Sequence, residues 1–260
     1  MASLSLAARL RAGESVFSAW SLIPDSQTVE LVARLDFGAV TLDMQHGGHH
    51  EDSVLRGVGA VRLKGKHPVV RIPVGRFDMA SRALDMGAET VIAPMVNSVE
   101  DARAFAAAMK YPPVGLRSWG PSFAMPRAGA SDAQTWLANE NANTVAFAMI
   151  ETRQALAALD DILAVDGIDG VLVGPSDFSI AWSNGATMDP ALEDMMPAIA
   201  SIAQKARAAG KHAAIYVVDP LLVGRFHAMG YRFFALGSEG AYMTDGAPAM
   251  LAAARGSIKG

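Results

Sequence analysis

The sequence contains no cysteine among its 260 residues, which excludes disulfide bonds, thiolate metal ligands and a cysteine nucleophile. Charged residues make up only 18% of the chain, and the net charge of -4 gives no excess of basic groups to bind nucleic acid. No apolar run is long enough to cross a bilayer, which takes about 20 apolar residues in a helix. These absences predict a soluble, cytoplasmic protein that binds neither nucleic acid nor a membrane.

The beginning of the chain carries Arg9 and Arg11 within an apolar stretch, which predicts a short amphipathic helix and not a signal peptide. A chain of this length can bury a large core, and α/β barrels of this size often form one domain. We therefore expect residues 1–260 to form a single domain.

A helix, a glycine and a short apolar run follow one another repeatedly along the chain. In four places the helix-like segment ends near a glycine, as where a helix leads into a buried parallel strand; the glycines are Gly38, Gly87, Gly167 and Gly230. Strands are predicted at 15–21, 67–73, 143–151 and 212–218, and within 35–45, 84–95, 165–175 and 228–237.

Eight strands that alternate with helical patterns favour a closed (β/α)8 barrel of the TIM type. A doubly wound sheet is less favoured, since no GxGxxG motif follows the first strand. The one long irregular segment, 111–134, lies between the fourth and fifth strands. A loop of this length is typical of a lid, a binding loop or an oligomer contact.

In such a barrel the chemistry lies at the carboxyl ends of the strands, and the sequence has unusual polar residues there. They are Asp43, Gln45 and His46 after the second strand, Arg71 in the third, Glu151 after the fifth and Asp177 after the sixth. Glu151 and Asp177 follow neighbouring strands, so their charges repel unless a proton or a cation lies between them. Their oxygen atoms favour Mg²⁺ or Mn²⁺, although Co²⁺ or Zn²⁺ could also bind. The alternative is that each carboxylate caps the helix that follows it.

Arg71 lies in the apolar segment VVRIP, where a guanidinium group needs an anionic partner. Its planar fork fits a carboxylate or an enolate oxygen. A structural ion pair with Asp43 is the alternative, and both can hold at once.

Histidine is the side chain that titrates closest to neutrality, so His46 suits a base or a proton shuttle. His49 and His50 suggest a zinc site with His46, but we expect both on an exposed loop after two glycines, which disfavours that alternative.

The turn VGPSD places the backbone N–H groups of Ser176 and Asp177 at the start of a helix. These groups could bind a small carboxylate. The alternative is an ordinary turn of the barrel that binds nothing.

A cation, an arginine and oriented amides around a base suit removal of a proton next to a carbonyl group, the first half of an aldol reaction. The alternative route through an imine needs a lysine at the mouth. The lysines fall elsewhere, at Lys64, Lys66, Lys110, Lys205, Lys211 and Lys259.

Six segments together resemble the HpcH/HpaI family of metal-dependent pyruvate aldolases: LDMQHG, VVRIP, LDMGAETVIAPMV, YPPVGLRSWGP, AMIET and VDGIDGVLVGPSDFS. The resemblance covers roughly residues 5–255. It implies a barrel of the phosphoenolpyruvate/pyruvate type, usually a homo-hexamer whose C-terminal helices are swapped between subunits. It also implies that Glu151 and Asp177 bind the metal, that Arg71 binds the enolate and that His46 transfers the proton. From the residues themselves, we expect Asp43 to orient Arg71.

The same resemblance identifies the amides of Ser176 and Asp177, in the turn that starts at Gly174, as substrate-binding groups. Asp85 matches an aspartate that the family associates with the histidine. The sequence puts Asp85 near the end of a helix, and hence at the base of its own barrel, so a neighbouring subunit could supply it. We expect the segment 117–127 to cover the mouth, where Trp119, with Arg117 and Phe123, could set the preference for the aldehyde.

The predicted reaction is the reversible addition of the enolate of pyruvate or hydroxypyruvate to an aldehyde, which also cleaves 4-hydroxy-2-keto acids. Gln45 and Met149 stand where some relatives have Glu and Gln, so hydroxypyruvate is open as the donor. Decarboxylation of oxaloacetate or cleavage of an acyl-CoA would use the same enolate site. A non-catalytic barrel that binds 2-keto acids is the alternative of a different class.

Overall fold

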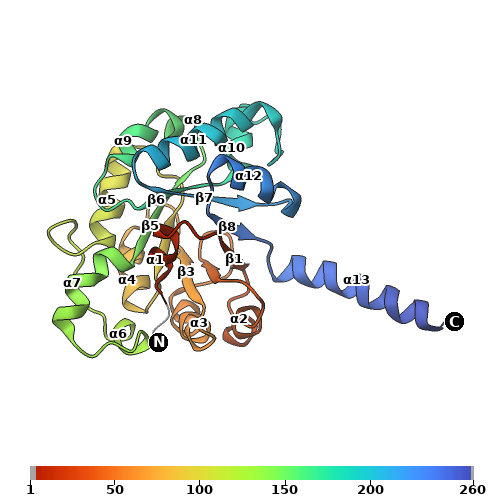
Figure 1. Ribbon diagram of the computed structural model, residues 1–260, viewed down its shortest axis with the longest axis horizontal. Coiled ribbons are helices and arrows are strands. Elements are labelled where there is room, and N and C mark those ends of the chain that lie inside the picture. The colour runs from red at the N-terminus through yellow and green to blue at the C-terminus, as the bar shows by residue number, and fades with distance from the viewer. Residues whose placement is uncertain (1–3, 259–260) are drawn as a thin grey trace.

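The apolar runs that follow a glycine form parallel strands, closed into a barrel within a ring of helices (Figure 1). The computed structural model describes residues 4–258. The strands are β1 (Val16–Ser21), β2 (Ala39–Asp43), β3 (His67–Arg71), β4 (Thr90–Ala93), β5 (Val145–Ile150), β6 (Gly170–Val173), β7 (His212–Val217) and β8 (Phe233–Leu236). They pair in chain order, and β8 pairs with β1 to close the sheet. The predicted (β/α)8 barrel is confirmed, and each strand lies within its predicted range.

The helices alternate with the strands as the periodicity indicated. They are α1 (Leu6–Arg11), α2 (Ser26–Ala33), α3 (Glu51–Leu63), α4 (Asp78–Asp85), α5 (Val99–Met109), α6 (Ala124–Arg127), α7 (Ala133–Asn143), α8 (Arg153–Ala157), α9 (Leu159–Leu163), α10 (Pro175–Trp182), α11 (Met196–Ala208), α12 (Val223–Met229) and α13 (Glu239–Ile258), with short 3₁₀ turns η1 (Glu193–Met195) and η2 (Pro220–Leu222). Gly87, Gly167 and Gly230 have φ angles of 103°, 90° and 114°, which glycine adopts easily, so they end helices and turn the chain into the next strand.

The core has two layers, one between the strands and the surrounding helices and one inside the barrel. The interior is filled by apolar side chains that include Val69, Ile92, Phe147, Leu172 and Phe233. Helix α1 closes the base of the barrel, since Leu6 and Leu10 are buried in this inner layer and the Leu6 N–H donates to Glu89 Oε2 at 2.8 Å. The short helix predicted at the beginning of the chain is therefore confirmed.

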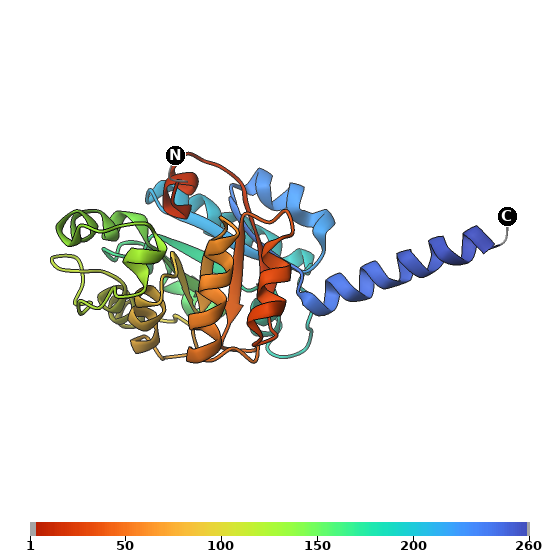
Figure 2. The same ribbon diagram turned by 90° about the horizontal axis from the view of Figure 1, so that it is seen from below.

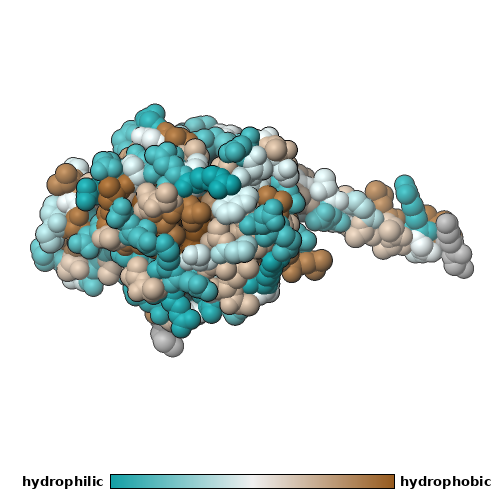
Figure 3. All heavy atoms as spheres, turned by 90° about the horizontal axis from the view of Figure 1, so that it is seen from above, coloured by the Kyte–Doolittle hydropathy of each residue, from teal (hydrophilic) through white to brown (hydrophobic). Residues whose placement is uncertain are grey.

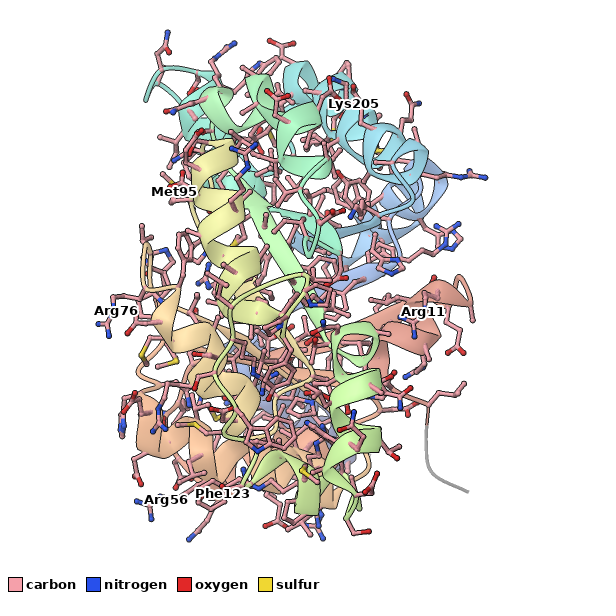
Figure 4. The ribbon with its side chains drawn as sticks, turned by 90° about the vertical axis from the view of Figure 1, so that its left-hand side faces the viewer. Arg11, Arg56, Arg76, Met95, Phe123 and Lys205 are labelled. Carbon is pink, nitrogen blue, oxygen red and sulfur yellow. The ribbon has the colours of Figure 1, made fainter. Side chains whose placement is uncertain are left out.

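The two ends of the barrel have different roles. The carboxyl ends of the strands form the mouth, and the ends where the strands begin form the base. Arg76 and Met95, which follow β3 and β4, lie at one end of the molecule, and Arg11 of α1 lies on the opposite side (Figure 4). The segment 111–134 follows α5 and leads through α7 into β5, so it lies at the base and includes the short helix α6.

Helix α13 projects away from the barrel (Figures 1 and 2). Every described residue from Met243 to Ile258 is exposed, and apolar and polar side chains are mixed along the projecting part (Figure 3). Within residues 4–258 no helix combines the length and the apolar character that a membrane span requires. The cytoplasmic location stays a prediction.

The contact between β6 and β7 gives a test of the barrel's packing. A Cβ atom at Gly170 would lie 2.4 Å from His212 O and 2.7 Å from Phe147 Cε1, so Gly170→Ala must force the two strands apart. We expect this variant to lower the free energy of unfolding by about 2 kcal/mol, measured by urea denaturation. Gly224→Ala, in helix α12 with no atom within 4 Å of the added carbon, is the control and should not lose stability. Equal stability of both variants would show that the strands separate without cost.

Candidate active site

A pocket of about 240 Å³ opens at the carboxyl ends of the strands. Its walls are formed by Trp20, Leu22, His46, Arg71, Met149, Glu151, Gly174, Pro175, Ser176, Asp177 and Tyr216. The sequence predicted His46, Arg71 and the two carboxylates as neighbours, and the barrel brings them together at one mouth. A larger hollow of about 670 Å³ runs along α5 and α9, outside the ring of strands.

Arg71 is held in one orientation by two neighbours. Its Nε and Nη2 atoms donate to the two oxygens of Asp43 at 2.9 Å and 2.6 Å, and its guanidinium carbon lies 4.9 Å from the centre of the Trp20 ring. Trp20 Nε1 donates to the same carboxylate at 3.1 Å. Burial raises the pKa of Asp43, but the hydrogen bonds and the charge of Arg71 outweigh this, so the pKa lies below its usual range. The expected ion pair is present, and the Nη1 side of the fork remains for a ligand in the pocket.

Asp43 also fixes the loop that carries His46. Asp43 Oδ1 accepts hydrogen bonds from the N–H groups of Gln45, at 2.9 Å, and of His46, at 3.2 Å. The Oε1 atom of Gln45 accepts a hydrogen bond of 2.8 Å from the Val74 N–H. The Gln45 side chain therefore supports the loop from outside the pocket. The His46 side chain is left at the exposed rim of the pocket, where a proton acceptor can reach a bound molecule.

Glu151 and Asp177 differ in their surroundings. Glu151 is buried, and its Oε2 atom accepts a hydrogen bond of 2.9 Å from the Met95 N–H. Burial raises the pKa of Glu151 to about 7; the bond from Met95 opposes the shift, and the nearby charge of Asp177 adds to it. Asp177 is exposed at the rim. A buried carboxylate that faces a second one is the arrangement that a cation would relieve.

Neither carboxylate acts as a helix cap, so the capping alternative is wrong. Helix α8 is capped by Thr152, whose side chain accepts from the Ala155 N–H, and α10 has Gly174 as its capping residue. Gly174 is required for a different reason, because a Cβ atom there would lie 2.4 Å from Glu151 Oε1. A side chain at this position would fill the space beside the carboxylate. The oxygen donors and this free space fit a hard divalent cation.

The turn into α10 offers the expected amides. The helix's first backbone bond runs from the Phe178 N–H to Gly174 O at 3.0 Å, so the N–H groups of Ser176 and Asp177 precede it and point out of the helix end. Both residues line the pocket. The geometry suits a small carboxylate held beside Glu151.

Sequence reasoning did not identify the two aromatic residues in the pocket. Trp20 and Tyr216 meet edge to face with ring centres 5.1 Å apart, on β1 and β7. Both lie near the carboxyl ends of their strands and point into the barrel, a signal that strict alternation along each strand could have given. None of the lysines among residues 4–258 lines this pocket, and Lys259 lies outside the described residues.

Asp85 and the 117–127 segment lie at the base of their own barrel, so they do not meet His46 there. Asp85 ends helix α4 and accepts a hydrogen bond of 2.8 Å from Arg117. Trp119 packs on Tyr111, with ring centres 5.7 Å apart, and is half exposed, as is Phe123. The expected lid over the mouth is wrong within one chain, because a segment between a helix and the next strand runs at the base. Asp85 and Trp119 therefore take no part in the pocket of their own chain.

His49 was expected on an exposed loop, and the structure corrects this. Its side chain is only 5% exposed and both ring nitrogens have partners, Ser21 Oγ at 2.9 Å and Ser53 Oγ at 3.1 Å. His50 stands apart as the capping residue of α3. Within residues 4–258, no three side chains of the His, Asp and Glu types form a metal cluster, and the three histidines do not converge.

The raised pKa of Glu151 predicts a pH-dependent effect on stability. In the folded protein the carboxyl group keeps its proton up to about pH 7, whereas the unfolded chain loses it near 4.5, so the free energy of unfolding falls as pH rises between these values. Glu151→Gln removes this loss of stability, because an amide does not ionise. The variant without metal should match the wild type at about pH 4, below the pKa of the unfolded chain, and exceed it at pH 8 by about 3 kcal/mol, measured by urea denaturation after chelator treatment. The same difference at both pH values would contradict the shift.

Comparison with known proteins agrees with the fold. A family profile described as HpcH/HpaI aldolase/citrate lyase matches residues 18–245. A hydroxypyruvate/pyruvate aldolase of Rhizorhabdus wittichii is 36% identical over 243 residues, 94% of this chain and 95% of that protein. A 4-hydroxy-2-oxo-heptane-1,7-dioate aldolase of Salmonella heidelberg is 33% identical over 244 residues, 94% of this chain and 91% of that protein.

Two solved structures have the same fold. An HpcH/HpaI aldolase from Desulfitobacterium hafniense DCB-2 superposes with a TM-score of 0.87 at 24% identity and covers 97% of each chain. The citrate synthase SbnG superposes with a TM-score of 0.85 at 26% identity, over 99% of this chain and 100% of that chain. With the profile match over most of its length, the chain belongs to the HpcH/HpaI aldolase/citrate lyase family.

Proposed function

We propose that this chain is a divalent-metal-dependent aldolase, which reversibly adds the enolate of pyruvate or hydroxypyruvate to an aldehyde and cleaves 4-hydroxy-2-keto acids. The observation that carries the proposal is Arg71, which Asp43 and Trp20 orient toward a pocket that also holds His46 and two carboxylates. The relatives named as aldolases support the same reaction.

Each group has a role that its position supports. The amides of Ser176 and Asp177 bind the carboxylate of the 2-keto acid at the start of α10. Arg71 donates to the oxygen that becomes negative when the enolate forms, and since it is already oriented, little reorganisation is needed. His46 removes the C3 proton and returns it in the reverse direction.

Glu151 and Asp177 are the proposed ligands of the metal. When bound there, a divalent cation supplies positive charge that polarises the keto group and stabilises the enolate. Oxygen ligands favour Mg²⁺ or Mn²⁺, and Co²⁺ or Zn²⁺ could also be held. Because Glu151 must lose its proton to act as a ligand, metal binding releases a proton when the pH lies below about 7.

The pocket walls support both donors. The Met149 side chain is apolar and offers no hydrogen bond to the hydroxyl group of hydroxypyruvate, whereas Tyr216, which also lines the pocket, carries a hydroxyl group of its own. Decarboxylation of oxaloacetate produces the same enolate, so we expect it as a side reaction of the site. A barrel that only binds 2-keto acids would need no base at the rim, and His46 therefore favours the enzyme.

We also propose a homo-hexamer in the cytoplasm, in which α13 packs on a neighbouring subunit and the face around Asp85 and Trp119 meets a neighbour's mouth. Helix α13 carries Met243, Met250 and Leu251 exposed along its length, and a helix so exposed gains little stability from its own barrel. The base of the barrel exposes Trp119 in the same way.

Exchange of the C3 protons of pyruvate and hydroxypyruvate into deuterated water tests the reaction. We expect NMR to show exchange with added Mg²⁺ or Mn²⁺ and its loss with excess chelator, since the cation lowers the energy of the enolate. Faster exchange of one acid identifies the preferred donor. The absence of exchange with both acids, on folded protein loaded with metal, would contradict the proposal.

Arg71→Lys is the matched variant for this assay. A lysine cannot replace the two-pronged contact, so exchange should fall by about 100-fold or more with the fold intact. Arg76→Lys, at an exposed ion pair with Asp78, is the control and should exchange like the wild type. Near-normal exchange by Arg71→Lys would remove Arg71 from the mechanism.

The proposed assembly can be tested by complementation. Asp85→Asn and His46→Asn variants, each inactive alone, should regain activity when co-expressed, because a mixed oligomer can combine an intact Asp85 and an intact His46 in one site. Sedimentation velocity of the full chain should give the mass of a hexamer. A monomer, or mixed oligomers without activity, would refute the sharing of sites.

A further inference from the structure

A chain of buried hydrogen bonds joins the beginning of α13 to the tip of β1. Glu239, the first residue of α13, is only 4% exposed. Its Oε1 atom accepts a hydrogen bond from Ser21 Oγ at 2.6 Å, and its Oε2 atom accepts one from the Leu22 N–H at 2.9 Å. Both oxygens of this carboxylate are therefore occupied by the segment that ends β1.

The bonds continue from β1 into the loop that carries His46. The Leu22 carbonyl oxygen accepts a hydrogen bond of 2.8 Å from the Gly48 N–H, so Leu22 is held by Glu239 on one side and holds the loop on the other. A Cβ atom at Gly47 would lie 3.0 Å from Leu22 Cα, which shows how closely the loop packs on this residue. Leu22 also lines the pocket.

A second route runs through Ser21. The Ser21 hydroxyl donates to Glu239, so it accepts from the Nε2–H of His49, whose other nitrogen meets Ser53 at the start of α3. The Ser21 side chain is fully buried and its hydroxyl group donates a hydrogen bond to a carboxylate, so it is not exposed to act as a nucleophile. Glu239 thus fixes the loop just after His46 at two neighbouring residues: Gly48 through Leu22, and His49 through Ser21.

The choice of a carboxylate at this position needs an explanation beyond helix capping. Among the described residues, Glu239 forms no ion pair with a lysine or an arginine, and an uncompensated buried charge is costly. A neutral serine could accept one bond at a helix start. Two oxygens that accept from Ser21 and Leu22 at once require a carboxylate or an amide, and only the carboxylate accepts through both.

We propose that Glu239 is a positioning residue for His46 and that it couples the seating of α13 to proton transfer in the pocket. The inference rests on the proposed function. Helix α13 leaves the barrel directly after Glu239, so a neighbouring subunit that holds the helix also fixes the direction in which this carboxylate meets β1 (Figure 2).

Two reactions of the same site separate this role from a merely structural one. Exchange of pyruvate C3 protons breaks a C–H bond, and His46 takes the proton. Decarboxylation of oxaloacetate breaks the C3–C4 bond instead; carbon dioxide leaves, the electron pair forms the enolate and no base is needed for this step. Arg71 and the carboxylates serve both reactions, whereas the placement of His46 matters for proton exchange alone.

Glu239→Gln is the test, because the amide keeps one acceptor and nearly the same size. With Mg²⁺ or Mn²⁺ added, we expect proton exchange to fall about tenfold or more while oxaloacetate decarboxylation stays within about twofold of the wild type. Glu193→Gln, at the exposed ion pair with Arg225, is the control and should leave both rates unchanged. A parallel fall in both reactions, or no change in either, would overturn the inference.

Amide hydrogen exchange supplies a readout that does not depend on activity. The Leu22 and Gly48 amides should lose protection in Glu239→Gln and keep it in Glu193→Gln. Unchanged protection would overturn the coupling even if the rates changed. If the wild type itself shows neither proton exchange nor decarboxylation, the proposed function fails, and the protection data still decide whether Glu239 holds the His46 loop.

Discussion

The carboxylate of Asp43 is the constraint on which the site depends. Its two oxygens accept from the guanidinium of Arg71, the indole of Trp20 and the backbone of Gln45 and His46. A buried ion pair stabilises a protein only where further hydrogen bonds satisfy its groups; here each oxygen of Asp43 has at least two donors, while the Nη1 side of Arg71 stays open toward the pocket. One side chain therefore fixes both the guanidinium group of Arg71 and the loop that carries His46.

A comparison of two buried carboxylates shows how the same chemical group serves different purposes. Asp43 is surrounded by donors and has a lowered pKa, whereas Glu151 has one backbone donor, a neighbouring negative charge and a raised pKa. Asp43 is thus electrically satisfied within the chain. Glu151 is not, and this unsatisfied group is the reason that we propose it as a ligand for a cation rather than a structural anchor.

Much of this arrangement could be predicted from the sequence, and the failures have physical causes. Glycines such as Gly87 before apolar runs indicated the strands, and strand ends then placed Arg71 and Glu151 together, since a closed parallel barrel leaves no other arrangement. The burial of His49 was missed because hydrogen bonds to residues distant in sequence decide it. The position of Trp119 was misjudged because loop length, rather than its place between a helix and a strand, was taken as the guide.

Gly174 limits how such a site can vary between proteins. A single methyl group there would collide with the Glu151 carboxylate, so the wall on the side of β6 has no freedom to change. Trp20 is fixed as well, by its hydrogen bond to Asp43 and by Arg71 over its ring, whereas Tyr216 on β7 meets the Trp20 ring edge to face. The shape of the pocket can therefore change more easily at Tyr216 than at Gly174 or Trp20, since a change at Tyr216 disturbs neither Glu151 nor the contacts that hold Arg71.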